Sequence, residues 1–98
     1  MFLHIGVDIA IFIKDIIGIF DLDSTTISNS TKEFLKVSEE EGFIESICDD
    51  LPKSFIVTQK GTMTKIYLSP ISAATLKKRV NFFAKKSIMD NLFFDGDE

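Results

Sequence analysis

Residues 54–68 read SFIVTQKGTMTKIYL, two runs of β-branched and aromatic residues joined by a polar segment that contains Gly61. β-Branched and aromatic side chains favour an extended backbone, and a glycine between two such runs supplies a turn. The stretch therefore predicts a β-hairpin with strands over 54–58 and 64–68. This hairpin is the clearest structural signal in the chain, and the other elements are placed around it.

A helix is predicted directly after the hairpin. Ser69 and Pro70 end the second strand, and apolar residues then recur with helical spacing from about Ser72 to Lys86. Residues at this spacing share one helix face, which predicts a buried stripe made of Ala73, Leu76, Val80 and Phe83. Phe82 lies away from that stripe, on the side of the helix that carries the lysines.

The sequence before the hairpin predicts further strands and a first helix. Apolar runs over 2–6, 9–13 and 16–22 indicate an opening strand followed by two strands or one bent strand, with Gly18 a candidate bulge or close-packing point. Ser30 and Glu33 fit a capping box, so a helix is expected from there to about Glu41, ended by Gly42. Residues 43–48 alternate imperfectly and could add a short strand.

These elements together predict an α+β fold, a small antiparallel sheet of about five strands with two helices. The chain has 98 residues, enough for one compact domain. We expect a single α+β domain over residues 1–86 and an acidic C-terminal tail over 87–98. Ten Phe against one Tyr and no Trp is more dry apolar surface than a thin core can bury, so a homo-oligomer is expected.

The start of the chain resembles neither a membrane span nor a secretion signal. Asp8, Lys14, Asp15 and Asp21 interrupt the apolar residues well before the roughly 20 that a span needs. A basic segment before the apolar stretch, as in a signal peptide, is missing. Cys48 is the single cysteine, so an internal disulfide is impossible. A cytoplasmic protein without membrane contact is expected.

Charge is strongly segregated along the chain. Residues 1–52 carry three basic and eleven acidic side chains, residues 53–86 carry eight basic side chains and no acid, and residues 87–98 add four acids. Such asymmetry indicates either an acidic partner or pairing between opposite halves of neighbouring subunits. Ordinary surface lysines are the plain alternative.

Histidine and cysteine, two residue types that often carry catalysis or bind metals, are nearly absent. His4 is the single histidine, and neither it nor Cys48 has a partner at metal-ligand spacing. Asp21 and Asp23 could hold a cation, although a solvated loop is the simpler interpretation. Neither a phosphate-binding glycine loop nor a hydrolase motif is present. We expect no enzyme activity, no metal and no cofactor.

The basic residues of the second helix are the candidate nucleic-acid-binding site. Lys77, Lys78 and Arg79 are consecutive, Lys85 follows two turns later, and Lys53 before the hairpin adds a further contact. Cationic side chains on a helix can neutralise phosphates without reading sequence. The alternative is that they form the solvated back of the helix.

Several segments, in order, resemble one bacterial family. They are residues 1–6 (MFLHIG), 14–21 (KDIIGIFD), 33–35 (EFL), 52–58 (PKSFIVT), 65–72 (KIYLSPIS) and 75–79 (TLKKR). Together they are similar to the extracellular matrix regulatory protein B family, over about residues 1–86.

The resemblance implies a cytoplasmic regulator related to the matrix regulator A proteins, which activate biofilm matrix genes, assemble as rings and bind DNA through arginines. Those arginines precede the central strand, where this chain has Asp49, Asp50, Leu51, Pro52 and Lys53. A further basic residue of that branch falls close to Asp15 here, so the helix basic run is a different surface.

Two functions are therefore expected to compete. The first is a non-catalytic, oligomeric DNA-binding regulator. The alternative is an oligomeric adaptor that binds no nucleic acid and pairs with a protein, such as a paralogous regulator. The direction in which the eight basic side chains of residues 53–86, the basic block, point should separate these two functions.

Overall fold

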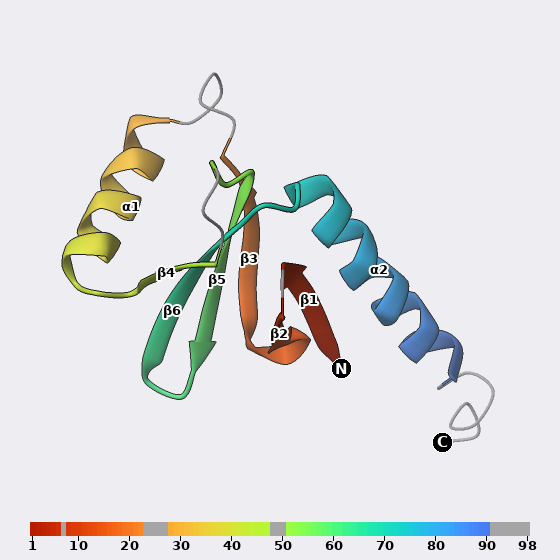
Figure 1. The fold of residues 1–98 in the computed structure, drawn as a ribbon. Helices are drawn as coiled ribbons and strands as arrows, with labels where there is room; N and C mark the ends of the chain where they lie inside the picture. Colours follow the sequence, from red (N-terminus) through yellow and green to blue (C-terminus); the bar gives the residue numbers. More distant parts are fainter. Residues whose placement is uncertain (7, 23–27, 48–50, 91–98) are drawn as a thin grey trace.

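A computed structural model describes residues 1–6, 8–22, 28–47 and 51–90, with the backbone alone over 83–90. Over these residues the chain forms two α-helices, a four-stranded sheet and a separate two-stranded sheet. The helices α1 and α2 flank opposite faces of the four-stranded sheet (Figure 1). The α+β class is thus confirmed, with six strands in two sheets instead of about five in one.

The predicted hairpin forms the centre of the larger sheet. Strand β5 (Ser54–Lys60) pairs antiparallel with β6 (Met63–Ser69), and Ser54 is opposite Ser69 in the register. Both strands are longer than predicted, so the connection is only Gly61 and Thr62. Gly61 has φ +61°, the left-handed conformation that two-residue hairpin turns require.

The two edge strands differ in direction. Strand β3 (Ile16–Asp21) pairs antiparallel with β5, and its register shifts between Ile16 and Gly18, in agreement with the bulge that was one of two alternatives for Gly18. Strand β4 (Ile44–Ser46) pairs with β6 in parallel, so the prediction of a purely antiparallel sheet is wrong. Helix α1 carries the chain back along the sheet after β3, and β4 therefore runs in the same direction as β6.

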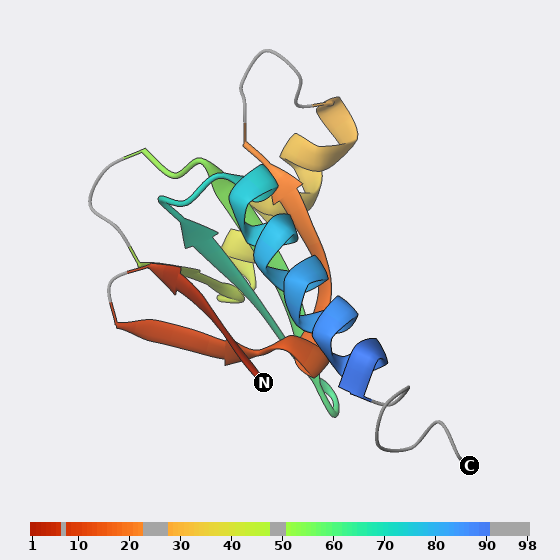
Figure 2. The same cartoon turned by 90° about the vertical axis from the view of Figure 1, so that its right-hand side faces the viewer.

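The two-stranded sheet is built from the first residues of the chain. Strand β1 (Phe2–Gly6) pairs antiparallel with β2 (Ile9–Phe12), and a short 3-10 helix over Ile13–Asp15 separates β2 from β3. Of the two alternatives for residues 9–22, two strands is the correct one. This hairpin packs beside α2 on one side of the larger sheet (Figure 2).

Helix α1 spans Asn29–Glu40 and begins earlier than predicted. Its cap is Ser28, whose hydroxyl accepts a hydrogen bond from the Thr31 amide at 3.1 Å. The predicted capping box at Ser30 and Glu33 is therefore wrong by two residues. The predicted end is confirmed to within one residue, because Gly42 follows with φ +79°.

Helix α2 spans Ala73–Asp90 and starts where the sequence predicts. The Ser72 hydroxyl accepts a hydrogen bond from the Thr75 amide at 3.2 Å, which satisfies one free donor of the first turn. Ala73 and Leu76 are buried and Val80 packs against them, as the stripe predicts, while the Phe83 side chain lies outside the described part. The helix runs past residue 86, where the domain was predicted to end, and residues 91–98 of the acidic tail lie outside the described residues.

The core lies between the larger sheet, the β1–β2 hairpin and α2. It joins residues from all of these elements, namely Leu3, Ile5, Ile11, Ile19, Ile56, Ala73 and Leu76. Successive strand residues face opposite ways: Ile56 is in this core, whereas its neighbour Phe55 meets the Phe34 ring of α1 at 6.4 Å between centroids. Neither helix of the described chain has the length and apolar content needed to cross a membrane.

Candidate nucleic-acid interface

Three consecutive basic residues of α2 point in different directions. Lys77, Lys78 and Arg79 are all exposed. The Arg79 guanidinium donates a hydrogen bond from Nη1 to the backbone oxygen of His4 on β1, at 3.2 Å. Because residues on a helix are about 100° apart, Lys77 then faces the other flank of α2 and Lys78 lies between them. The run therefore spreads its charge around the outer half of the helix.

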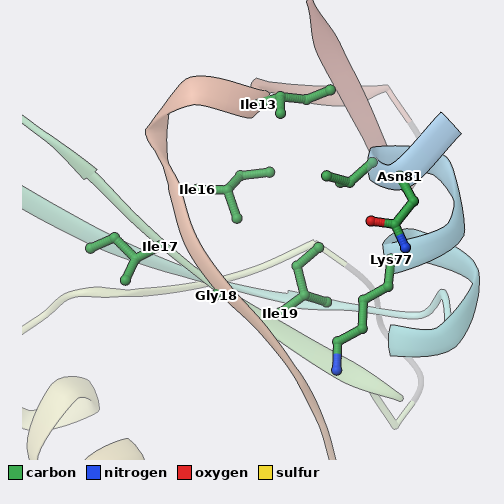
Figure 3. A pocket seen from close by; sticks show the side chains of 8 residues that line it. Ile13, Ile16, Ile17, Gly18, Ile19, Lys77 and Asn81 are labelled. Atoms are coloured by element: carbon green, nitrogen blue, oxygen red, sulfur yellow. The ribbon is translucent and has the colours of Figure 1, made fainter. Parts of the chain in front are cut away.

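Lys77 borders a cleft between α2 and the edge strand β3. The cleft encloses about 320 Å³ and its floor is apolar, with Ile13, Ile16 and Ile19 opposite Val80. Figure 3 shows Lys77 and Asn81 on the helix side and these isoleucines on the strand side. Our sequence predictions did not include Asn81, although its i+4 spacing from Lys77 places it on the same flank.

Lys53 lies at the end of the sheet from which α2 starts. Its amide donates to the Ser69 carbonyl at 2.8 Å, and its carbonyl accepts from the Leu22 amide at 3.0 Å, so its backbone is held on both sides. The next residue, Ser54, donates from its hydroxyl to the Ile71 carbonyl at 2.7 Å, just before α2. These bonds fix the backbone of Lys53 near the first turn of α2, and its side chain is exposed. Lys85 belongs to α2, but its side chain lies outside the described part.

The basic block does not form one contiguous surface. Lys60 and Lys65 lie at the far end of the β5–β6 hairpin, away from the start of α2 (Figure 1). Lys65 pairs with Glu45 of β4, Nζ to Oε1 at 3.0 Å, and this hydrogen bond together with the carboxylate charge raises the pKa of the Lys65 ammonium. Between Ala73 and Met89, by contrast, the sequence contains no acid. Lys77, Lys78 and Arg79 therefore have no acidic neighbour within two turns of their own helix.

The residues considered for metal binding or catalysis do not form a centre in the described part of the chain. No group of three His, Cys, Asp or Glu side chains lies close enough there to hold a metal ion. His4 is exposed on β1, and its part in the structure is the backbone carbonyl that accepts from Arg79. Asp21 ends β3 and is exposed, whereas Asp23 and Cys48 lie outside the described residues.

Comparison with known proteins extends these observations. Residues 2–80 match the family model described as extracellular matrix regulatory protein A-like. The chain is also similar to extracellular matrix regulatory protein B of Bacillus subtilis (strain 168), with 39% identity over 82 residues. That alignment covers 84% of this chain and 93% of the relative. The family model ends at residue 80, within α2, so all six strands, helix α1 and the Lys77–Arg79 run lie inside the matched region.

Proposed function

Because the chain belongs to the extracellular matrix regulatory protein A-like family, we propose that it is a non-catalytic, oligomeric regulator of bacterial matrix genes that binds DNA in the cytoplasm. The similar B. subtilis protein is named as an extracellular matrix regulatory protein, which supports the regulatory role. The DNA contact is proposed to use Lys77 and Lys78, with Arg79, Lys53 and Lys85 around them.

The observation that carries this proposal is the distribution of charge on the two helices. Lys77, Lys78 and Arg79 are exposed within the first two turns of α2, and no acid interrupts the helix before Asp90. Helix α1, on the opposite face of the larger sheet, ends instead in Glu39, Glu40 and Glu41. A polyanion would therefore approach the α2 side and be repelled from the α1 side.

Binding of this kind would depend on phosphate contacts and would discriminate little between DNA sequences. Each lysine that neutralises a phosphate releases counterions, and log K then falls with log salt by a slope of about −0.9 per phosphate. Few contacts per subunit are available, so useful affinity requires several subunits on one duplex. Oligomerisation is thus part of the proposed mechanism.

The test compares two charge reversals of equal size by fluorescence anisotropy on a labelled duplex. Lys77→Glu with Lys78→Glu should abolish binding at about 50 mM salt, because both exposed cations become anions. The matched control, Lys32→Glu with Lys36→Glu, makes the same change on α1 and should keep binding within a few-fold. Equal losses in the two double variants would overturn the assignment to α2.

The adaptor function is the second candidate, and one apolar cleft favours it. A cleft of about 400 Å³ lies between α1 and the strands β3 and β5, lined chiefly by Ile17, Phe20, Phe34 and Phe55. Ile17 is 62% exposed, and Phe20 and Phe34 are both more than 40% exposed. A patch of this kind suits a protein contact. Should the wild-type protein fail to bind any duplex at low salt, this function replaces the first.

A further inference from the structure

Another cleft, distinct from the two described above and on the same side of the sheet as α2, combines aromatic rings with lysines. It encloses about 380 Å³ between the outer face of the β1–β2 hairpin and the far end of β5 and β6. Its principal lining residues are Phe2, Phe12, Lys60, Met63, Lys65 and Tyr67. None of the basic residues that we assign to DNA on α2 or at Lys53 lines it.

The register of the strands explains why these side chains share one space. Phe2 is opposite Phe12 in the β1–β2 pair, and both face outward because their neighbours Leu3 and Ile11 are buried in the core. On the hairpin, Met63, Lys65 and Tyr67 alternate along β6, and Lys60 is opposite Met63. Period-two alternation therefore gathers them on one face.

The aromatic rings leave an apolar surface open to solvent. Phe2 and Phe12 stack with 4.2 Å between ring centroids and an interplanar angle of 28°. Phe12 is half-buried, but Phe2 remains 54% exposed, so a flat ring next to the cleft is accessible. An exposed aromatic pair of this geometry can accept a third planar ring by stacking.

Cations surround these rings. The Lys14 Nζ lies 5.4 Å from the centroid of the Phe12 ring, and the Lys65 Nζ lies 5.8 Å from that of Tyr67. Lys60 is exposed at the hairpin end. Two acids are nearby: Asp15 lines the cleft, and Glu45 holds Lys65 at 3.0 Å. Lys14 and Lys60 are therefore the cations best placed to meet an anion, and Lys65 is restrained by Glu45.

We propose that this cleft binds single-stranded nucleic acid, with an unpaired base stacked on Phe2 and the flanking phosphates on Lys60 and Lys14. Flat π faces beside cations are what an unstacked nucleotide requires, because each base presents an aromatic face and each link carries one negative charge. A duplex keeps its bases inside the stack and cannot use the ring of Phe2. The inference goes beyond the proposed duplex binding, since it uses different residues on a different surface.

The first experiment separates base stacking from charge. Labelled oligomers of about 12 nucleotides are titrated as poly-dT, poly-U and an abasic strand with the same phosphates. Phe2→Leu keeps an apolar side chain but removes the ring, and should weaken binding to the base-bearing strands by about 5- to 150-fold. It should leave the abasic strand unaffected. Phe43→Leu, at an aromatic that is 40% exposed outside the cleft, is the matched control and should change neither.

The second experiment predicts a gain of binding and so does not depend on a destabilised variant. Glu45→Gln removes the carboxylate that holds Lys65, and should tighten binding to the single strand by about two- to fivefold. Glu40→Gln, on α1, makes the same change of charge and should have no effect.

The outcomes distinguish this proposal from the proposed function. Lys77→Glu with Lys78→Glu should leave single-strand binding intact even where duplex binding is lost. Binding of either poly-dT or poly-U with these dependences supports the cleft, and a preference between them identifies the natural strand as DNA or RNA. Equal affinity for base-bearing and abasic strands, or loss of single-strand binding in the α2 double variant, would overturn it.

Discussion

Two buried serines connect the larger sheet to the rest of the fold. Ser54 and Ser69 are opposite each other in the β5–β6 register, and neither side chain is accessible to solvent. The Ser69 hydroxyl donates to the Ile5 carbonyl of β1 and accepts from the Ile71 amide at 3.0 Å. One small side chain thus joins β6 to the first strand and to the segment that leads into α2. A buried hydroxyl is tolerated here because both of its hydrogen bonds are made.

We expect Ser69→Ala to lower the free energy of unfolding by about 1–3 kcal/mol, because a buried carbonyl and a buried amide lose their partner. Urea denaturation followed by circular dichroism measures this change. Ser30→Ala is the control, since Ser30 is exposed and is not the cap of α1, and it should cost less than about 0.5 kcal/mol. A Ser30 variant as destabilised as the Ser69 variant would mean that the cap is at Ser30 after all.

Serines in this chain also have structural roles that the local sequence does not predict. Ser69 was predicted only as the end of a strand, because a hydroxyl that bonds a residue 64 positions away leaves no local pattern. The cap of α1 was misplaced for a related reason. Ser28 and Ser30 are both acceptable caps on local preference alone, and in the structure the earlier one is the cap.

At the scale of elements, helix α2 was the most predictable part of the chain. Its apolar residues repeat at helical spacing, and of the predicted stripe the structure buries Ala73 and Leu76 and packs Val80 against them. Periodicity reports which face is buried, and hence that Lys77 and Lys78 are exposed. It does not report what lies beside each flank, so the contact from Arg79 to β1 was not predictable.

The stripe gives a prediction for stability. Leu76 is fully buried between α2 and the core, so Leu76→Ala should lower the free energy of unfolding by about 2–5 kcal/mol through lost burial and a cavity. Lys78→Ala, two positions away and exposed, should change it by less than about 0.5 kcal/mol. Thermal melts of both variants provide the measurement. Similar melting temperatures for the two would show that the buried face is misassigned.

Strand β4 illustrates the limit of the same reasoning. Alternation predicts that a segment is extended, but the direction in which it pairs depends on the path of the connecting chain. β4 follows α1, whose position over the sheet is a tertiary property. The parallel pairing of Ile44 with Ile66 was therefore outside what residues 43–48 could indicate.

For the whole molecule, the arrangement of charge and apolar surface decides function. The eight cations between Lys53 and Lys86 are evident in the sequence, but the fold separates Lys60 and Lys65 at the far hairpin end from Lys53 and the cations of α2. That division depends on the hairpin extending away from the start of α2. The cleft of Phe2, Phe12 and Tyr67 was equally hidden, since its residues come from three strands at distant positions in the chain.

We expect the protein to be an oligomer in solution. The exposed Ile17, Phe20 and Phe34 around the α1 cleft are more apolar surface than a small monomer ordinarily shows. Static light scattering at tens of micromolar should give a mass well above the 11.0 kDa of one chain. Ile17→Glu should lower that mass, because it places a charge within the patch, whereas Glu40→Gln should not. A wild-type mass of one chain would contradict the expectation.

The β1–β2 hairpin packs against residues that are synthesised much later, and this affects the order in which the chain folds. This hairpin is synthesised before the other described elements, yet its partners Ser69 and Arg79 lie 64 and 75 residues later than the carbonyls they bind. At a ribosomal rate of about 5–20 residues per second, Ser69 is made roughly 3–13 s after Ile5. During that interval the core that holds Leu3, Ile5 and Ile11 lacks its α2 members, Ala73 and Leu76. The β1–β2 hairpin must therefore dock late, and its contacts with Ser69 and Arg79 add to the contact order that the pairing of β3 with β5 already gives the domain.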